Sequence, residues 1–264
     1  MQLNLQNNMQ YMVCCVPVSA VRKDPSHRSE IVTQQLFGEK SIITDTASDG
    51  WAKIQMKYDG YEGWVQNSHL TALDEEYYLR VDKDLAGEWV NEITYNGHPM
   101  MVPLGSSLGA FRNGTAFWRR NSVQYKDKPW NPDEVEITPK LIKQIAYKYL
   151  NTSYLWGGKS VFGIDCSGYA QMVYKFLNIV LPRDSSVQAQ LGITVNFLQE
   201  ARCGDLAFFD NEEGRINHVG ILLNDHEIIH SSGKVRLDKI DNEGIFNLDN
   251  KVRTHRLRII KRFF

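Results

Sequence analysis

Cys166 is the cysteine whose setting in the sequence could make it a nucleophile. It follows a glycine-rich stretch, residues 156–163, and stands at the start of a predicted helix. At a helix N-terminus, unpaired backbone N–H groups and the helix dipole favour the thiolate, and the same N–H groups can bind an oxyanion. We therefore expect a lowered pKa for Cys166 and a role in nucleophilic catalysis.

A nucleophilic cysteine needs a general base, and two histidines are spaced to act together in that role. His218 opens an apolar strand, and His230 ends the strand that follows. If these strands form a hairpin, the two imidazoles lie side by side. His218 would then accept the proton, while His230 would orient its ring and hold its tautomer.

The remaining thiols and imidazoles carry weaker signals. A lone cysteine is usually an inert, small hydrophobic residue, and this applies to the cysteines without a glycine-rich approach and a helix start, namely Cys14, Cys15 and Cys203. The histidines in polar or turn-like contexts are expected to be solvated: His27, His69, His98, His226 and His255. Cys166, His218 and His230 lack the paired spacing of a zinc site, so we expect no metal.

The elements that must position these residues form an α+β domain. Thr138 and Pro139 are the N-cap and first residue of a helix predicted to reach about Asn151. A second helix is predicted over 166–177, and a third begins after residues 182–185. The predicted strands that follow are 205–209, 218–223, 227–230 and 253–261. Helices first and strands afterwards favour an antiparallel sheet.

The N-terminal half is rich in strands and turns. Apolar or β-branched runs separated by Asp-Pro and Asp-Gly turns predict a small antiparallel barrel from strands at 11–18, 30–37, 40–44, 51–56 and 63–65. Residues 77–130 are again strand-like and predict a second small barrel, with a linker at 126–132. The predicted domains are therefore 1–72, 73–132 and 133–264.

Composition narrows the possible partners and the cellular location. The chain has 264 residues, 42% of them hydrophobic, and a formal net charge of −1. This balance excludes disorder and gives no electrostatic case for nucleic acid or an anionic membrane. No apolar run reaches the roughly 20 residues of a membrane span. Four cysteines do not make a disulfide framework, which favours the cytoplasm; a leader removed earlier would leave the same record, so a periplasmic or exported location stays open.

Five motifs occur in the order found in one family of bacterial enzymes. They are Trp156-Gly157-Gly158, Asp165-Cys166-Ser167-Gly168, residues 204–209, residues 218–221 and Ile229-His230-Ser231. In this order they resemble the NlpC-type cysteine peptidases of bacterial cell-wall peptides. Residues 58–67, with 29–39, resemble the bacterial SH3-like barrels attached to cell-wall enzymes. Together they are most similar to the γ-D-glutamyl-L-diamino-acid endopeptidases of that family.

The resemblance implies a papain-like C-terminal domain and a catalytic role for four residues. Cys166 would be the nucleophile, His218 the base and His230 its orienter, while the hydroxyl of Tyr154 would help to stabilise the oxyanion. The substrate would be a murein stem peptide, L-Ala-γ-D-Glu-diamino acid, cleaved after D-Glu. No cofactor is implied, and we expect a monomer.

The resemblance also implies a set of substrate-binding residues. Asp165, with Glu30 and Tyr61 of the barrel, would bind the free α-amine of an N-terminal L-Ala. The residues expected to line the cleft or to face the D-Glu carboxylate are Trp156, Ser167, Arg183, Ser185 and Ser186.

Simpler interpretations exist for several of these substrate residues. Glu30 and Tyr61 would be solvated barrel surface, and Asp165 would be only a helix N-cap. Trp156 would pack in the core, and Ser185 would cap the helix that follows.

Two alternative functions compete with peptide hydrolysis. A cell-wall-binding protein would use its barrels while the C-terminal domain stays inactive. A thiol acyltransferase on the same fold would pass the acyl group to an acceptor other than water. Analysis of the reaction products separates the three.

Overall fold

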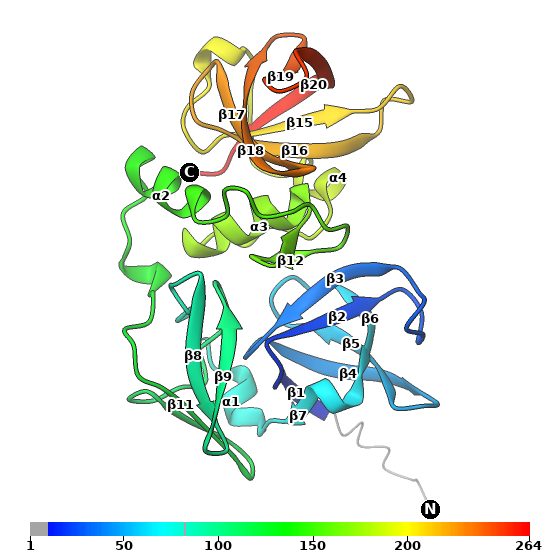
Figure 1. The fold of residues 1–264 in the computed structure, drawn as a ribbon, viewed down its shortest axis with the longest axis vertical. Helices are drawn as coiled ribbons and strands as arrows, with labels where there is room; N and C mark the ends of the chain where they lie inside the picture. The colour runs from blue at the N-terminus through cyan, green and yellow to red at the C-terminus, as the bar shows by residue number, and fades with distance from the viewer. Residues whose placement is uncertain (1–9, 82) are drawn as a thin grey trace, which may run out of the picture.

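The chain folds into three units packed around a layer of helices, as Figure 1 shows. The computed structural model describes residues 10–81 and 83–264. An N-terminal barrel (blue) and a second sheet (green) lie on one side of the helices, and the C-terminal sheet (yellow to red) lies on the other. The fold is α+β, as predicted.

The N-terminal unit is a seven-stranded antiparallel sheet in the order β3-β2-β6-β5-β4-β1-β7. Its strands are β1 (Gln10–Cys14), β2 (Val18–Arg22), β3 (Ile31–Leu36), β4 (Lys40–Ala47), β5 (Trp51–Met56), β6 (Glu62–Gln66) and β7 (Leu70–Ala72), followed by the helix α1 (Glu75–Leu79). The prediction of one strand over 11–18 is wrong, because Pro17 falls between β1 and β2 and has no N–H for a strand ladder. The other four predicted strands are confirmed.

The region predicted as a second barrel contains a four-stranded antiparallel sheet in the order β10-β11-β8-β9. Its strands are β8 (Val90–Tyr95), β9 (His98–Pro103), β10 (Thr115–Trp118) and β11 (Asn121–Tyr125). The buried ring of Trp118 lies in its core, and Val13 and Phe37 of the N-terminal barrel belong to the same cluster. The two N-terminal units therefore share a core.

The helices begin as the sequence predicted. In α2 (Pro139–Tyr147) the Thr138 hydroxyl accepts a hydrogen bond from the Leu141 N–H at 3.2 Å, which confirms the N-cap. α2 ends before the predicted Asn151, whose φ of +67° is incompatible with a helix. The prediction of α3 (Cys166–Phe176) is confirmed, and the short α4 (Ser185–Gln188) follows it. No helix within residues 10–81 and 83–264 is long and apolar enough to cross a membrane.

The C-terminal sheet closes on itself. Its order is β14-β20-β15-β16-β17-β18-β19, and β19 also pairs with β20. Its strands are β14 (Ile193–Val195), β15 (Leu206–Asp210), β16 (Ile216–Leu222), β17 (Glu227–Ser232), β18 (Lys234–Asp241), β19 (Gly244–Asn247) and β20 (Val252–Arg262). The antiparallel pairing is confirmed, but β14, β18 and β19 were not predicted. Through β18 and β19 the sheet becomes a barrel.

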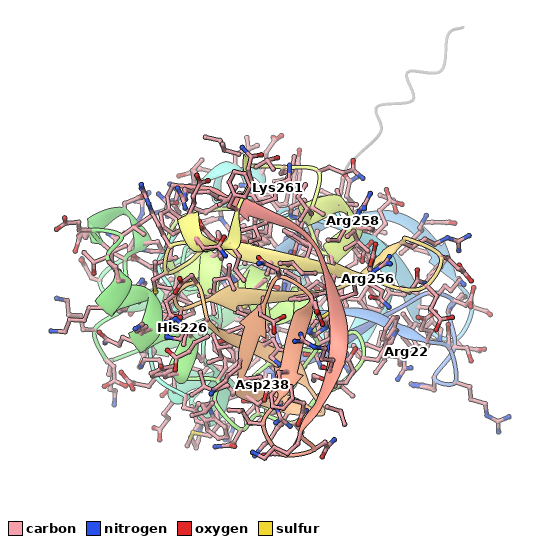
Figure 2. The ribbon with its side chains drawn as sticks, turned by 90° about the horizontal axis from the view of Figure 1, so that it is seen from above. Arg22, His226, Asp238, Arg256, Arg258 and Lys261 are labelled. Carbon is pink, nitrogen blue, oxygen red and sulfur yellow. The ribbon has the colours of Figure 1, made fainter. Side chains whose placement is uncertain are left out.

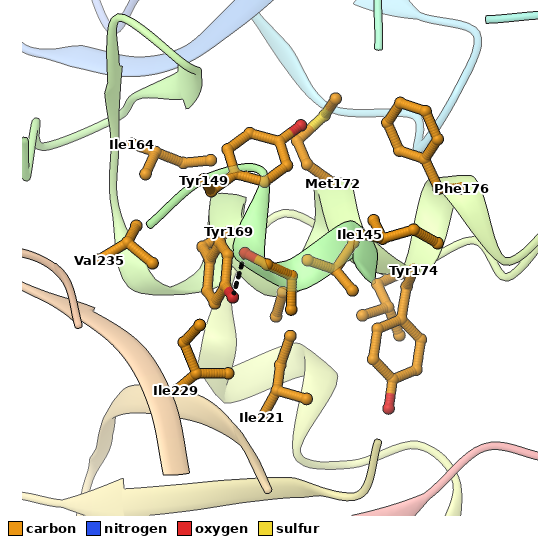
Figure 3. Close-up of a cluster of buried hydrophobic side chains, with 14 of the residues drawn as sticks. Ile145, Tyr149, Ile164, Tyr169, Met172, Tyr174, Phe176, Ile221, Ile229 and Val235 are labelled. Atoms are coloured by element: carbon orange, nitrogen blue, oxygen red, sulfur yellow. Dashed lines mark hydrogen bonds between the residues drawn. The ribbon is translucent and has the colours of Figure 1, made fainter. Parts of the chain in front are cut away.

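A buried apolar cluster holds α3 against this sheet (Figure 3). Tyr169 of α3 packs between the helices and the sheet, and its hydroxyl donates to the Ala146 carbonyl oxygen at 3.1 Å. Ile221 and Ile229 cover the other side of the cluster. Each fully buried aliphatic side chain contributes about 1.5–3 kcal/mol relative to an exposed one. The first residue of α3 is thereby held at a fixed place.

The N-terminal barrel meets the helical layer through a buried ion cluster. Glu39 accepts hydrogen bonds from Lys159 at 3.0 Å and from Lys175 at 2.7 Å, and all three side chains are buried. The ring of Tyr58 lies within 5.7 Å of both ammonium groups. The ion cluster joins the turn before β4 to α3 and to the short strand β12 (Lys159–Ser160). β12 pairs with β13 (Gly163–Ile164).

Candidate active site

Cys166 is the first residue of α3 and is nearly buried. The expectation of a lowered thiol pKa is wrong: burial raises the pKa of Cys166 to about 12, and the neighbouring Asp165 carboxylate raises it further. The backbone N–H of Val219, the charge of Arg183 and the backbone N–H of Ser167 lower the pKa, but they do not outweigh burial. The thiol therefore rests in its protonated form.

The structure brings His218 and His230 together. Gly220 of β16 pairs with His230 of β17, and His218 Nε2 lies 2.8 Å from His230 Nδ1. Both imidazoles are buried, and burial lowers the pKa of each; the nearby His230 and His255 rings lower that of His218 further. Because the Nε2 of His218 faces His230, its Nδ1 is the nitrogen left for the thiol.

A carboxylate that sequence analysis missed continues this chain of hydrogen bonds. Asp238 of β18 accepts from His230 Nε2 at 3.0 Å, and its side chain is fully buried. Arg236 binds the same carboxylate with two nitrogens, at 2.7 and 3.0 Å. The sequence offered one indication of its burial. Side chains alternate between the two faces of a strand, and in residues 234–241 Asp238 lies two residues from Ile240, on the same buried face.

A third histidine stands against the base, contrary to the expectation that His255 is solvated. Its ring stacks on His218 with centroids 4.1 Å apart and planes 26° apart. A bulge in β20 leaves Thr254 unpaired, between the pairs Phe246↔Arg253 and Ile245↔His255, and such bulges change the direction of side chains.

Among the described residues no group of three or more His, Cys, Asp and Glu side chains is arranged to hold a metal ion.

Tyr154 lies close enough to Cys166 for their charges to interact. Burial, then the Cys166 and Asp165 charges, raise the pKa of Tyr154 to about 12, so its hydroxyl remains a donor at neutral pH. The backbone positions it, because Tyr154 N–H donates to the Gly233 carbonyl oxygen at 2.9 Å. Its part in stabilising an oxyanion stays a prediction.

Both carboxylate oxygens of Asp165 have hydrogen-bond partners within the protein. Its Oδ1 accepts from the Gly168 N–H at 2.7 Å, which confirms the N-cap interpretation. Arg183, itself buried, pairs with both oxygens at 2.6 and 3.0 Å and also donates to the Ser167 hydroxyl at 2.8 Å. The Nε of Arg183 donates to Thr33 of β3 at 2.8 Å. Arg183 thus joins the N-terminus of α3 to the N-terminal barrel.

The barrel residues also meet the loop that precedes the nucleophile. Trp156 Nε1 donates to Glu30 Oε1 at 2.7 Å, and Trp156 is 62% exposed, so the core-packing interpretation is wrong. Gly157 has a φ of +74°, and a Cβ there would lie 2.2 Å from the Ile31 carbonyl oxygen. Only glycine lets this loop come so close to β3.

Two other predicted substrate residues, Ser185 and Ser186, begin α4, and a third, Tyr61, contacts the residue before it. Tyr61 of the barrel donates from its hydroxyl to Asp184 at 3.5 Å. Ser185 is half-buried and Ser186 is exposed. The interpretation of Ser185 as a helix cap is wrong, because the N-cap residue of α4 is Asp184.

Two family models match the chain in the regions that carry this site. Residues 151–254 match the NlpC/P60 family, and residues 21–70 match the bacterial dipeptidyl-peptidase SH3 domain.

Curated relatives cover most of the chain. A γ-D-glutamyl-L-lysine dipeptidyl-peptidase of Bacillus subtilis is 31% identical over 219 residues, which are 76% of this chain and 72% of the relative. A relative of the same name from Bacillus cereus is 27% identical over 78% of this chain and 68% of its own. Dipeptidyl-peptidase 6 of Lysinibacillus sphaericus is 21% identical over 83% of this chain and 88% of its own.

The fold is shared with a solved structure over nearly the whole chain. An NlpC/P60 family protein from Bacillus cereus has a TM-score of 0.78 at 18% identity, covering 96% of this chain and 99% of that one. Cys166, His218 and His230 fall inside the matched family region. The Bacillus subtilis relative is more than 30% identical over most of its length. This chain therefore belongs to the NlpC/P60 family, and it is a cysteine peptidase with a bacterial SH3 domain ahead of its catalytic domain.

Proposed function

We propose that this protein hydrolyses the amide bond between the γ-carboxyl of D-Glu and the diamino acid in peptidoglycan stem peptides that begin with a free L-Ala. The observation that carries the proposal is the set of Cys166, His218 and His230. Cys166 is the first residue of α3, and the two histidines, whose Nε2 and Nδ1 atoms lie 2.8 Å apart, belong to strands that contact α3. The Bacillus relatives are named γ-D-glutamyl-L-lysine dipeptidyl-peptidases, and these names supply the substrate class.

In the acylation step the Cys166 proton moves to His218 Nδ1 as the sulfur attacks the scissile carbonyl carbon. Burial raises the pKa of Cys166 and lowers that of His218, which favours the neutral form of both groups before the attack, so the proton moves as the sulfur attacks. The Tyr154 hydroxyl and backbone N–H groups at the start of α3 stabilise the oxyanion. His218 then gives the proton to the departing amine, and the C–N bond breaks.

In the second step water hydrolyses the thioester. His218 takes a proton from the water as its oxygen attacks the acyl carbon, and it returns a proton to the sulfur as the C–S bond breaks. The products are the dipeptide with a free γ-carboxylate and the regenerated thiol. No cofactor takes part in either step.

The test is incubation with L-Ala-γ-D-Glu-L-Lys and with L-Ala-γ-D-Glu-meso-diaminopimelate, with products followed by mass spectrometry. The expected products are L-Ala-D-Glu and the free diamino acid, and Cys166→Ala is the control that abolishes them. A new acyl conjugate in place of the free acid would indicate an acyltransferase. No change in either peptide would refute the proposed peptidase activity.

The barrel gives a structural basis for preferring a free amine. Asp165 has its charge balanced by Arg183, whereas Glu30 has Trp156 as its hydrogen-bond partner and lies at the exposed edge of the loop before Cys166. A carboxylate there attracts the ammonium group of L-Ala, and Tyr61 lies on the same barrel.

A single substitution separates the charge of Glu30 from its hydrogen bond. In Glu30→Gln the side-chain oxygen still accepts from Trp156, so only the charge is lost. We expect a rise in KM of about tenfold for the free tripeptide, with little change for the N-acetylated form. An unchanged KM would rule out this role for Glu30.

We also propose that the protein acts in the cytoplasm, on wall peptides taken up for reuse. The support is that Cys14, Cys15, Cys166 and Cys203 are all free thiols. Cell fractionation with an antibody to the protein tests this, and recovery in the periplasmic or external fraction would contradict it.

A further inference from the structure

We propose that Asp238 is a positioning residue for the two catalytic histidines, and that it sets which nitrogen of His218 carries the proton, so that a lone pair faces the thiol. The inference rests on the proposed function, because it concerns the base of that reaction. It assigns a role to a carboxylate on β18, a strand that carries none of the residues identified by motif. Figure 2 shows Asp238 among the strands of the C-terminal barrel.

The surroundings of Asp238 fix it as an ionised acceptor. Its Oδ2 accepts from His230 Nε2 at 3.0 Å and from Arg236 Nε at 2.7 Å. Its Oδ1 accepts from Arg236 Nη2 at 3.0 Å and from the Leu248 N–H at 2.8 Å. Burial alone would raise the pKa of Asp238, but these bonds hold it below the ordinary value. An ionised carboxylate has no proton to donate.

The direction of each bond then follows along the chain. Because Asp238 only accepts, His230 carries its proton on Nε2, and its Nδ1 has a lone pair. That lone pair accepts from His218 Nε2 at 2.8 Å, so His218 also carries its proton on Nε2. The lone pair of His218 is therefore on Nδ1, where the reaction needs it to take the proton of Cys166.

A purely structural role for Asp238 is the competing interpretation. Arg236 also binds Asp249 at 2.9 Å and Asn247 at 3.1 Å, so the ion pair ties β18 to the turn after β19. Such a role predicts lost stability without a specific effect on the base. The two interpretations differ in how Asp238→Asn acts when His230 is absent.

Asp238→Asn is expected to reverse the chain of hydrogen bonds. The new NH2 group can only donate, and either orientation sets it against one N–H of Arg236. If the NH2 group faces Leu248, it also meets a backbone N–H, which is always a donor. If it faces His230, it meets a ring whose proton can move from Nε2 to Nδ1, so that Nε2 becomes an acceptor. The NH2 group therefore turns to His230, His218 must then hold its proton on Nδ1, and no lone pair faces Cys166.

The experiment compares the wild type, Asp238→Asn, His230→Gln and the double variant. With the tripeptide, we expect Asp238→Asn to lower kcat about 100-fold or more while KM stays within about twofold. In the His230→Gln background the same substitution should change kcat less than about threefold, because it acts through His230. An equal loss in both backgrounds, or an unchanged kcat, overturns the proposal.

A matched control measures the cost of losing a buried ion pair alone. Asp205 is as buried as Asp238 and is held by Arg262 with two nitrogens, at 2.8 and 2.7 Å, but no histidine contacts it among the described residues. We expect Asp205→Asn to lower the melting temperature while kcat stays within about threefold. A 100-fold loss of kcat in this control would show that any broken ion pair inactivates the enzyme, and would overturn the proposal.

Alkylation of Cys166 by iodoacetamide tests the inference without the peptide substrate. Because the thiol ionises only by passing its proton to His218, the rate at pH 7 should fall in Asp238→Asn in parallel with kcat. A wild type that is alkylated rapidly but does not cleave the tripeptide would refute the substrate and leave the role of Asp238 standing. Equal alkylation rates in the wild type and in Asp238→Asn would overturn the role itself.

The wild-type tautomers can also be read directly, which covers the case that Asp238→Asn does not fold. Nitrogen NMR of protein labelled at histidine distinguishes Nε2–H from Nδ1–H, and His230→Gln and His255→Phe assign the signals. We expect Nε2–H for both His218 and His230. Nδ1–H for either ring overturns the proposal.

Discussion

The buried carboxylate of Glu39 is predicted to hold the N-terminal barrel on the catalytic domain. In Glu39→Gln, Lys159 and Lys175 stay buried but lose the one carboxylate that they share. Removing one partner of a buried ion pair costs about 3–5 kcal/mol, because the remaining charge is left without compensation. We therefore expect the free energy of unfolding to fall by about 3 kcal/mol at pH 7.

The pKa of Glu39 gives a second route to this magnitude. Burial would raise it, but the two lysines and the Leu36 N–H lower it from 4.5 to about 2, and at about 1.4 kcal/mol per pH unit this corresponds to about 3.5 kcal/mol. The pKa of Lys175 indicates an opposing contribution to stability. Burial lowers this pKa, and so does the charge of Lys159, although Glu39 raises it. Two cations share one anion, so the value from Glu39 alone is an upper bound for the cluster.

The pH dependence of stability distinguishes this ion cluster from ordinary packing. A carboxyl whose pKa is lowered by folding stabilises the protein above its unfolded pKa and loses this effect as pH falls toward its folded pKa. The wild type should therefore lose about 1.4 kcal/mol more than Glu39→Gln between pH 7 and pH 3.5, measured by urea unfolding.

The exposed pair of Lys53 and Glu62, 3.0 Å apart, provides the control for this experiment. We expect Glu62→Gln to cost less than about 1 kcal/mol, since solvent screens an exposed pair. Parallel pH curves for the wild type and Glu39→Gln would refute the reasoning.

Four further substitutions, at three positions, probe the site and the elements that support it. His255→Phe should keep a ring stacked on His218 and leave kcat within about threefold, whereas His255→Ala should lower kcat about tenfold in the same saturated assay. Gly157→Ala should lower the free energy of unfolding by about 2 kcal/mol and raise KM, because its Cβ would collide with the barrel backbone; an unchanged melting temperature would contradict this. Thr138→Ala should cost about 1 kcal/mol in thermal unfolding with kcat unchanged, and a kcat loss would show that α2 does more than support α3.

Local signals in the sequence located the helices and the reacting groups. Thr138 and Asp165 are N-caps in the structure, and each is followed by a helix that begins where the cap predicted. The pair of His218 and His230 could be placed because a hairpin relates residues that are close in the sequence. Such features depend on neighbours within a few residues, which is the range over which capping and strand alternation act.

The electrostatics of the site could not be predicted in this way. The helix N-terminus acts on Cys166 as expected, but burial outweighs it, and burial depends on α3 being covered by three units. His255 and Asp238 reach the base only because β18, β19 and β20 close the barrel. No motif near Cys166 encodes that closure, so both residues were missed.

The same reasoning explains why substrate selection is harder to predict than catalysis. The nucleophile and its histidines lie in one domain and are spaced along one stretch of chain, whereas the cleft wall depends on contacts between domains. Trp156 is held by Glu30, and Arg183 bridges Asp165 to Thr33 across 150 residues of sequence. The barrel thus fixes the loop and the helix terminus on either side of the thiol. We infer that changes in the barrel can alter which peptide is accepted while the proton-transfer chain through His218 stays intact.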